Sequence, residues 1–498
     1  MSGSLPAFAY GFAKHQGVVL LGLDDDGGRA RVGLREDADP AALLEARRSL
    51  GIELDVEVLP RAAFDRRLSE LYADAALAGG AGELDLPGDL DALAGDIPAT
   101  EDLLDARDDA PVIRLINGLI AEAARIGASD VHIEPFESAL VVRLRVDGVM
   151  REALRLPGRI APLLVSRVKV MARLDIAEKR LPQDGRIGLA MGSKALDVRV
   201  STLPARGGER VVLRILDKDQ GTLSLDGLGM EPPVRAALER ALRVPNGIVL
   251  VTGPTGAGKT TTLYAALAAL NDGRRNILTV EDPVEYAIDG VGQTQVNARV
   301  GMTFAAGLRA ILRQDPDVVM VGEVRDPETA QIAVQASLTG HLVLSTVHTN
   351  DAPGAVTRLR DMGIESFLLA SSLRLVLAQR LLRRLCTACR QPLPGDAAAQ
   401  RLLGPAAAGS TLYRAAGCAR CSHTGYAGRL GIHEALEVDE AMRQLIGAGA
   451  DEDAIAAHAF ARGGRLGDAA RAAVLRGETT LEEAMRVTRQ ELQDHGGV

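Results

Sequence analysis

The chain has 498 residues, a net charge of −9, 47% hydrophobic residues and no tryptophan. Its length predicts roughly two to four domains. It contains no apolar run of about 18 residues, so we expect no membrane-spanning helix, and the N-terminal MSGSLPAFAY lacks the basic start of a signal peptide. The acidic balance argues against binding of nucleic acid through a basic face. These features predict a globular protein that stays in the cytoplasm.

Residues 1–82 predict a small α+β domain. Strands are expected in GVVLLGL (17–23) and IELDVEVL (52–59), and helices in residues 40–51 and 62–77. Residues 83–109 follow, with ten acidic residues, one basic residue and interspersed Gly and Pro. This composition indicates a solvated linker, and an acidic docking segment is the alternative.

Residues 110–222 predict a second α+β domain, with a helix over 110–128 and strands within 139–156, 186–204 and 209–218. From Leu228 to the C-terminus strands alternate with helices, which is typical of an α/β domain with a mainly parallel sheet. Within this domain the Ala-rich residues 395–410 are interpreted as a loop insertion.

A glycine-rich turn, GPTGAGKTT, follows the apolar strand IVLVT and precedes an apolar helical pattern. It fits G-x-x-x-x-G-K-[ST], in which glycines let backbone N–H groups surround a phosphate at a helix N-terminus. Lys259 would contact the β- and γ-phosphates, and the Thr260 hydroxyl would bind Mg²⁺. We therefore predict an ATP and Mg²⁺ site at Gly253, Pro254, Thr255, Gly256, Ala257, Gly258, Lys259, Thr260 and Thr261.

Three later strands of the same domain end in polar residues. These residues are Glu281, Asp282 and Glu285 in TVEDPVE, Glu323 in VVMVGE, and Ser345, Thr346 and His348 in LVLSTVHTND. Ligands of open α/β sheets bind at the carboxyl ends of strands, so these groups are expected to converge on the glycine-rich turn. Glu323 would position Mg²⁺ or the attacking water. Taken singly, Glu285 could be a solvated acid and His348 a buried core histidine.

All four cysteines lie in two C-x-x-C pairs, Cys386 with Cys389 and Cys418 with Cys421, separated by 28 residues. Two such pairs can place four thiolates around a structural Zn²⁺ with no open coordination position. The alternatives are two disulfides, which a reducing cytosol disfavours, and a redox-active pair. We predict a zinc subdomain over residues 384–425.

With these motifs the chain resembles the secretion ATPase superfamily, which powers type II secretion and type IV pili. GPTGAGKTTTLY resembles its Walker A motif, TVEDPVE its aspartate box, ILRQDPDVVMVGEVRD its Walker B motif and GHLVLSTVHTNDA its histidine box. The resemblance covers roughly residues 110–490. It implies a hexameric ATPase with a RecA-like P-loop domain (228–498) that contains the zinc subdomain. A PAS-like α+β domain (110–222) and an N-terminal docking domain (1–82) would precede it.

The resemblance also implies catalytic roles. Glu323 and Glu285 would act on water or Mg²⁺, and His348 would belong to the same site. Arg199 in DVRVST and Arg214 in VVLRIL match arginines that contact the nucleotide phosphates in the family. A strand arginine is more often solvated or salt-bridged, so this structural interpretation stays open beside the catalytic one.

The N-terminal LPAFAYGFAKHQGVVLL resembles the E components of type II secretion, whose first domain docks on the cytoplasmic part of a bitopic inner-membrane protein. Such ATPases drive pseudopilus assembly and protein export at an inner-membrane platform protein, and are held peripherally at the membrane. A type IV pilus-extension ATPase is the alternative within the family. Outside it, the alternatives are a non-hydrolysing nucleotide-gated scaffold and a nucleic-acid motor, for which the 3% aromatic content offers little base stacking.

Overall fold

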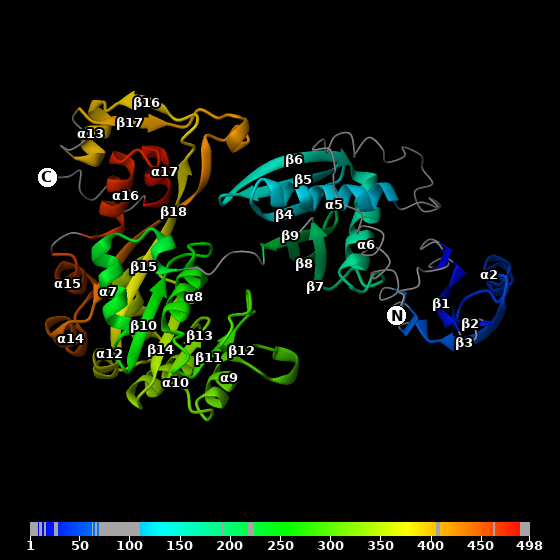
Figure 1. The fold of residues 1–498 in the computed structure, drawn as a ribbon, viewed down its shortest axis with the longest axis horizontal. Coiled ribbons are helices and arrows are strands. Elements are labelled where there is room, and N and C mark those ends of the chain that lie inside the picture. The colour runs from blue at the N-terminus through cyan, green and yellow to red at the C-terminus, as the bar shows by residue number, and fades with distance from the viewer. Residues whose placement is uncertain are drawn as a thin grey trace. The chain divides into compact units, whose positions relative to one another are not determined.

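The structure is a computed structural model that describes residues 8, 12–13, 16–23, 28–61, 63–64, 67–68, 110–191, 194–217, 224–404, 409–461 and 464–488. The chain forms two compact units, residues 1–219 and 220–498 (Figure 1). The linker predicted over 83–109 lies outside the described residues, as does most of the helix predicted over 62–77.

The N-terminal part of the first unit is a three-stranded sheet with the order β1-β2-β3. Its elements are β1 (Val18–Leu23), β2 (Arg29–Arg35), α2 (Ala42–Leu50) and β3 (Glu53–Leu59). The two predicted strands and the first predicted helix are confirmed. The central strand β2 was not predicted, because exposed arginines alternate with only three small or apolar side chains, Ala30, Val32 and Leu34, which are buried.

The rest of the first unit is a six-stranded antiparallel sheet with the order β6-β5-β4-β9-β8-β7. Its strands are β4 (Ala128–Pro135), β5 (Ala139–Val146), β6 (Val149–Pro157), β7 (Gln183–Met191), β8 (Lys194–Ala205) and β9 (Gly208–Asp217). The helices α5 (Ala110–Arg125) and α6 (Ala161–Met171) pack against it, with the short turn η1 (Gly158–Ile160) before α6. Alternate strand residues such as Val131, Val198 and Leu213 are buried in the shared core. The predicted helix and strands are confirmed, whereas α6 and the central strand β4 were not predicted.

The second unit contains a seven-stranded sheet with the order β12-β11-β13-β14-β10-β15-β18, parallel except for β18. Its strands are β10 (Gly247–Thr252), β11 (Ile277–Glu281), β12 (Gly292–Gln295), β13 (Val318–Val321), β14 (Leu342–Val347), β15 (Leu373–Leu385) and β18 (Tyr426–Glu437). The predicted mainly parallel sheet is therefore confirmed.

Both faces of this sheet are covered by helices (Figure 1). Val249 and Val251 of β10 point into one core, shared with η2 (Leu225–Leu228), α7 (Pro232–Leu242) and α8 (Lys259–Leu270). Ile248 and Leu250 point into the opposite core. That core is formed with α9 (Phe304–Ile311), α10 (Pro327–Leu338), α11 (Ala352–Asp361) and α12 (Ser366–Ser372), and the turn η3 (Ala298–Val300) precedes α9. A strand with apolar residues on both sides is what a buried parallel strand requires.

The long strands β15 and β18 extend beyond the sheet to a small subdomain (Figure 1). It contains β16 (Gln391–Pro394), α13 (Ala397–Leu403), β17 (Thr411–Arg414) and η5 (Ala419–Cys421). After β18 the described residues form α14 (Glu440–Gly447), α15 (Glu452–Ala459), α16 (Leu466–Leu475) and α17 (Leu481–Val487). The interpretation of residues 395–410 as a loop was wrong. Asp396 caps α13 by accepting from the Ala399 N–H, and Ala399 and Leu403 are buried. In the described part of the chain, none of the helices is both long and apolar enough to cross a bilayer.

Candidate nucleotide site and metal centre

The glycine-rich turn lies between β10 and α8 and depends on backbone conformations that favour glycine. Gly253, Gly256 and Gly258 have φ values of 143°, 81° and 87°. At Gly253 a Cβ atom would also lie 2.5 Å from the carbonyl oxygen of Gln379, a contact that no larger residue could make. The turn therefore adopts a tight form at the N-terminus of α8, where phosphates are bound in P-loop proteins.

Lys259 is buried, with 8% of its surface exposed, and its ammonium group faces back into the turn. Nζ donates to the carbonyl oxygens of Gly253 (2.8 Å) and Pro254 (3.1 Å). Burial lowers the pKa of Lys259 to about 8, although the carboxylate of Glu323 opposes this shift. The predicted phosphate ligand thus has a desolvated charge that an anion would stabilise.

His348 lies between Lys259 and Glu323. Its Nδ1 is 3.5 Å from Lys259 Nζ, and its Nε2 is 3.3 Å from Glu323 Oε2. Glu323 follows β13, its side chain is only 13% exposed, and Arg325 Nε is 2.6 Å from the same Oε2 atom. The structure therefore brings together three of the predicted residues, Lys259 at the start of α8, Glu323 after β13 and His348 after β14.

Gln379 of β15 supports the turn from the side and was not predicted. Its Nε2 donates to Ala257 O at 2.6 Å, and its Oε1 accepts from Thr262 Oγ1 at 2.7 Å, so both ends of the amide are used. The side chain is 2% exposed. The sequence does hold a signal, because Gln379 is a lone amide within the apolar strand LRLVLAQRLL.

Glu281, the last residue of β11, does not face the turn as expected. Glu281 is 2% exposed and is anchored by neighbours: Thr279 Oγ1 donates to it at 2.5 Å, and the Tyr264 hydroxyl donates to it as well. Burial raises the pKa of Tyr264, which keeps it a donor. The backbone N–H of Glu285 donates to the same Tyr264 oxygen at 3.2 Å, which ties the aspartate box to α8. Glu281 is thus a structural anchor.

Ser345 and Thr346 also depart from the expected convergence. Ser345 Oγ donates to Val321 O at 2.7 Å, and Thr346 Oγ1 donates to Gly322 O at 2.8 Å. Because hydroxyls on a buried strand must find partners inside the protein, both are used to hold β14 against the end of β13, just before Glu323.

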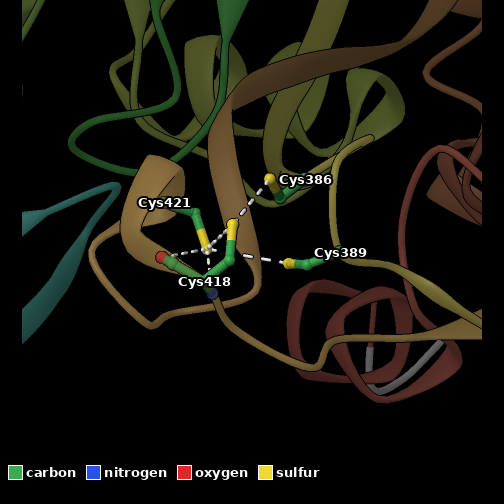
Figure 2. A group of neighbouring side chains, drawn as sticks. All are labelled: Cys386, Cys389, Cys418 and Cys421. Carbon is green, nitrogen blue, oxygen red and sulfur yellow. Dashed lines mark hydrogen bonds between the residues drawn. The ribbon is translucent and has the colours of Figure 1, made fainter.

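The four cysteine sulfurs form one cluster, in which all lie within 4.8 Å of one another (Figure 2). The Sγ–Sγ distances are 4.0 Å for Cys386 and Cys418, 3.8 Å for Cys389 and Cys421, and 3.8 Å for Cys418 and Cys421. Thiolates at the corners of a tetrahedron, each about 2.3 Å from Zn²⁺, are about 3.8 Å apart. A disulfide requires about 2.05 Å, and all four cysteines are free. The geometry thus fits the predicted zinc set and contradicts the disulfide alternative.

Two backbone groups favour the thiolate form of Cys421. Desolvation disfavours this thiolate, but the N–H groups of Cys418 and Gly425 each donate to its Sγ at 3.2 Å and lower its pKa. A thiolate is the form that binds zinc.

Arg199 and Arg214 lie in the first unit, where they are direct cross-strand neighbours on β8 and β9. Arg214 Nε donates to Asp130 Oδ1 at 2.9 Å, and the Asp130 side chain is 6% exposed. Arg214 is thus salt-bridged in this structure. Asp130 was not predicted, because it belongs to the unpredicted strand β4.

The arrangement of this domain is typical of P-loop nucleotide-binding proteins. A glycine-rich turn follows β10 and a carboxylate follows β13, and the single strand β14 lies between these two strands. The chain therefore contains a P-loop nucleotide-binding domain. Residues 105–486 match the family described as "Type II/IV secretion system protein", and residues 5–72 match an N-terminal domain family of "GSPII protein E". The chain belongs to the type II/IV secretion system protein family.

Curated relatives match over nearly the full length. The chain is 57% identical to "Type II secretion system protein E" of Pseudomonas aeruginosa, over 97% of this chain and 96% of that protein. It is 54% identical to "Type II secretion system ATPase E" of Vibrio cholerae, over 95% of each.

Among solved structures, the ATPase DotB of Legionella pneumophila is similar with a TM-score of 0.55 and 20% identity, over 75% of this chain and 95% of that one. The pilus retraction motor PilT with bound ADP is similar with a TM-score of 0.51 and 26% identity, over 75% and 97%.

Proposed function

We propose that this chain is an ATPase that hydrolyses ATP to power pseudopilus assembly and the export of folded proteins by a type II secretion system. The observation that carries the proposal is the meeting of Lys259, His348 and Glu323 at the glycine-rich turn. Relatives that match over nearly the full length are named for type II secretion, which favours this system over pilus extension.

Each of the site residues is proposed to have its own role in the reaction. Lys259 and the N–H groups of the turn bind the phosphates, and Thr260 and Glu323 would hold Mg²⁺, which offsets phosphate charge when bound. Glu323 orients the attacking water, and Glu285 is the second acid proposed for this task. His348 contacts both Lys259 and Glu323, so it can hold the carboxylate in place while the lysine moves to the phosphates.

Arg199 and Arg214 are proposed as phosphate-contacting arginines that complete the site when the middle domain closes on the nucleotide. A guanidinium can grip phosphate oxygens bidentately and offset charge that develops in the transition state. For Arg214, this role requires it to leave Asp130. An arginine that arrives only on closure would couple hydrolysis to movement.

The working assembly is proposed to be a homohexamer on the cytoplasmic side of the inner membrane. Residues 1–82 would dock on the cytoplasmic part of a bitopic secretion protein, and the ATPase domain would act on an inner-membrane platform protein. The match of residues 5–72 to a domain of secretion protein E supports this docking role. The four cysteines would hold Zn²⁺ as a purely structural ion, because they leave no open position.

Two substitutions test the hydrolytic role. Lys259→Ala should remove most ATP affinity, because it deletes charge that stabilises the bound phosphates, whereas Glu323→Gln should bind ATP and fail to turn it over. Steady-state phosphate release and equilibrium ATP binding separate the two effects. Glu440→Gln is the matched control, since this acid lies on α14 with 71% of its side chain exposed. Normal phosphate release by Glu323→Gln would contradict the assignment.

A further inference from the structure

Thr252 is a buried polar residue at the end of the central strand β10. The register pairs it with Val347, the last residue of the neighbouring strand β14. Thr252 is 0% exposed. A buried hydroxyl costs free energy unless it forms hydrogen bonds, and valine, which has nearly the same shape, would fill this space without that cost. The hydrogen-bond partners of the hydroxyl should therefore show what it does.

The Thr252 hydroxyl contacts the backbone on both sides of His348. Its Oγ1 accepts from the Thr349 N–H at 3.0 Å, and it lies 3.2 Å and 3.3 Å from the carbonyl oxygens of Val347 and Thr349. It is also 2.6 Å from Thr349 Oγ1. Because Thr349 Oγ1 donates to Asp351 O at 2.8 Å, the Thr252 hydroxyl is the donor in that 2.6 Å contact. A chain of hydrogen bonds thus runs from Thr252 to Asp351, the N-cap of α11.

The side-chain contacts of His348 hold its ring only weakly. Nδ1 is 3.5 Å from Lys259 Nζ, Nε2 is 3.3 Å from Glu323 Oε2, and 43% of the side chain is exposed. Both distances are beyond the range of strong hydrogen bonds. The position of the ring therefore depends mainly on the backbone of residues 347–349, which Thr252 Oγ1 contacts.

Thr252 also connects this backbone to the glycine-rich turn. Gly253, the next residue, begins the turn, and Lys259 Nζ donates to the Gly253 carbonyl oxygen at 2.8 Å. The backbone of Thr252 thus leads into the segment that holds Lys259, and its side chain holds the segment that carries His348.

We propose that Thr252 is a positioning residue for ATP hydrolysis, which keeps His348 between Lys259 and Glu323 through its hydrogen bonds to residues 347–349. Thr252 acts through His348 and needs no contact with the nucleotide. This inference rests on the proposed function, in which His348 holds the carboxylate of Glu323 in place.

The first test is Thr252→Val in the full-length chain, with kcat and KM for ATP measured by phosphate release. We expect kcat to fall about threefold to tenfold, the range for loss of one hydrogen bond. KM should change less than about twofold, because the phosphate-binding groups of the turn are kept. Thr252→Ser keeps the hydroxyl and should restore most of the parent kcat. A raised KM with the parent kcat would show that Thr252 supports only the turn, and would overturn the inference.

A double-mutant cycle with His348→Ala shows whether Thr252 acts through His348. We expect His348→Ala to lower kcat, and the added Thr252→Val substitution to lower it no further, because residues that act through one another are not additive. If Thr252→Val lowers kcat by the same factor with and without His348, the two residues act independently and the inference is wrong. The same conclusion follows if His348→Ala keeps the parent kcat.

Thr479→Val is the matched control, since it also removes a buried threonine hydroxyl. Thr479 is 0% exposed, and its Oγ1 donates to Arg383 O at 2.8 Å. This variant should lower the melting temperature, as Thr252→Val does, and keep the parent kcat. If both variants lose kcat to the same extent, turnover follows stability in general and Thr252 has no special role.

Hydrogen exchange of the nucleotide-free protein separates this inference from the proposed function. Amides within residues 347–352 should exchange faster in Thr252→Val, because the Thr349 N–H loses its acceptor, and at the parent rate in Thr479→Val. Faster exchange in a parent protein that releases no phosphate would refute the proposed hydrolysis and leave the hydrogen-bonded link standing. Exchange at the parent rate in Thr252→Val would overturn the link, even where hydrolysis is observed.

Discussion

At Lys259, burial changes the pKa of a side chain that we propose to bind phosphate. Its pKa in the folded chain, about 8, lies below the ordinary value of 10.5. Between these two pH values the unfolded chain binds more protons than the folded chain, so stability rises with pH there. Below pH 8 Lys259 is charged in both the folded and the unfolded chain, so the folded chain carries the full free-energy cost of burying this charge. The buried charge of Lys259 therefore lowers the free energy of unfolding of the nucleotide-free protein at neutral pH. A bound anion would offset this cost.

This environment predicts proton uptake on nucleotide binding. Phosphates beside Lys259 favour its charged form and raise its pKa, so ATP binding at pH 8.5 should take up a fraction of a proton, and binding at pH 7 should take up much less from this group. Calorimetry in two buffers with different ionisation enthalpies measures the uptake. Binding by the same protein at pH 7 is the control, and an uptake at pH 8.5 no larger than that at pH 7 would assign the proton elsewhere.

Site residues that lie within a recognisable sequence motif could be predicted from the sequence. Residues whose role depends on a partner far away in the chain could not. Lys259, Glu323 and His348 carry the chemistry of their motifs, and the structure brings them together. The role of Gln379 depends on its hydrogen bonds to Ala257 O and Thr262, which lie more than 100 positions earlier in the chain. For the same reason Glu281 was expected near the ligand, because its anchor Tyr264 lies on a different element.

At the scale of elements, the amide of Gln379 links β15 to α8 and to the glycine-rich turn. Gln379→Met keeps the length of the side chain but leaves Ala257 O without this donor and Thr262 without this acceptor. Urea unfolding should show a loss of about 1–3 kcal/mol, and ATP affinity should fall because the turn loses its lateral support. Gln335→Met on the exposed side of α10 is the control. Unchanged stability and affinity in Gln379→Met would show that the turn holds its shape without this amide.

A second prediction at the scale of elements concerns the proposed zinc subdomain. A tetrahedral thiolate site contributes folding free energy to a part of the chain with little core of its own. Cys386→Ser should therefore lower bound zinc and soluble yield, while the soluble fraction still binds ATP. Metal analysis and ATP titration check this, with Thr387→Ser in the same C-x-x-C segment as control. Absence of zinc from carefully purified parent protein would contradict the prediction.

Helices and strands with a clear periodicity of apolar residues could be predicted from the sequence. Those in which apolar and charged residues are mixed, or in which the apolar residues are small, could not. β10 and α5 carry uninterrupted or clearly periodic apolar residues. β2 and β4 are central strands with charged residues on one face, Arg29 and Arg31 in β2 and Asp130 and Glu134 in β4, so their short alternation resembles a polar loop. α13 was hidden by its alanines, which favour a helix but add little apolar signal.

At the scale of the whole molecule, attachment to a membrane is predicted to depend on residues 1–82. A motor that works on a membrane complex needs a contact through which force is transmitted, and the proposed docking domain would supply it. A chain that begins at Ala110 should keep ATP binding and lose co-sedimentation with membranes that contain the secretion complex. The full-length chain on membranes without that complex is the control. Equal membrane recovery of the truncated and full-length chains would refute the docking role.

The outer strand β12 has a consequence for how copies of this chain can meet. It has only four residues, GQTQ, and the amide of Gln293 is turned inward to Glu281 Oε1 (3.2 Å) and Tyr286 O (3.1 Å). A long, flat, apolar edge invites strands of another molecule to extend the sheet, and a short polar edge discourages this fusion. Subunits in a ring would then meet through side chains, helices and loops. Such contacts can part and re-form at each cycle of a motor without breaking a shared backbone ladder.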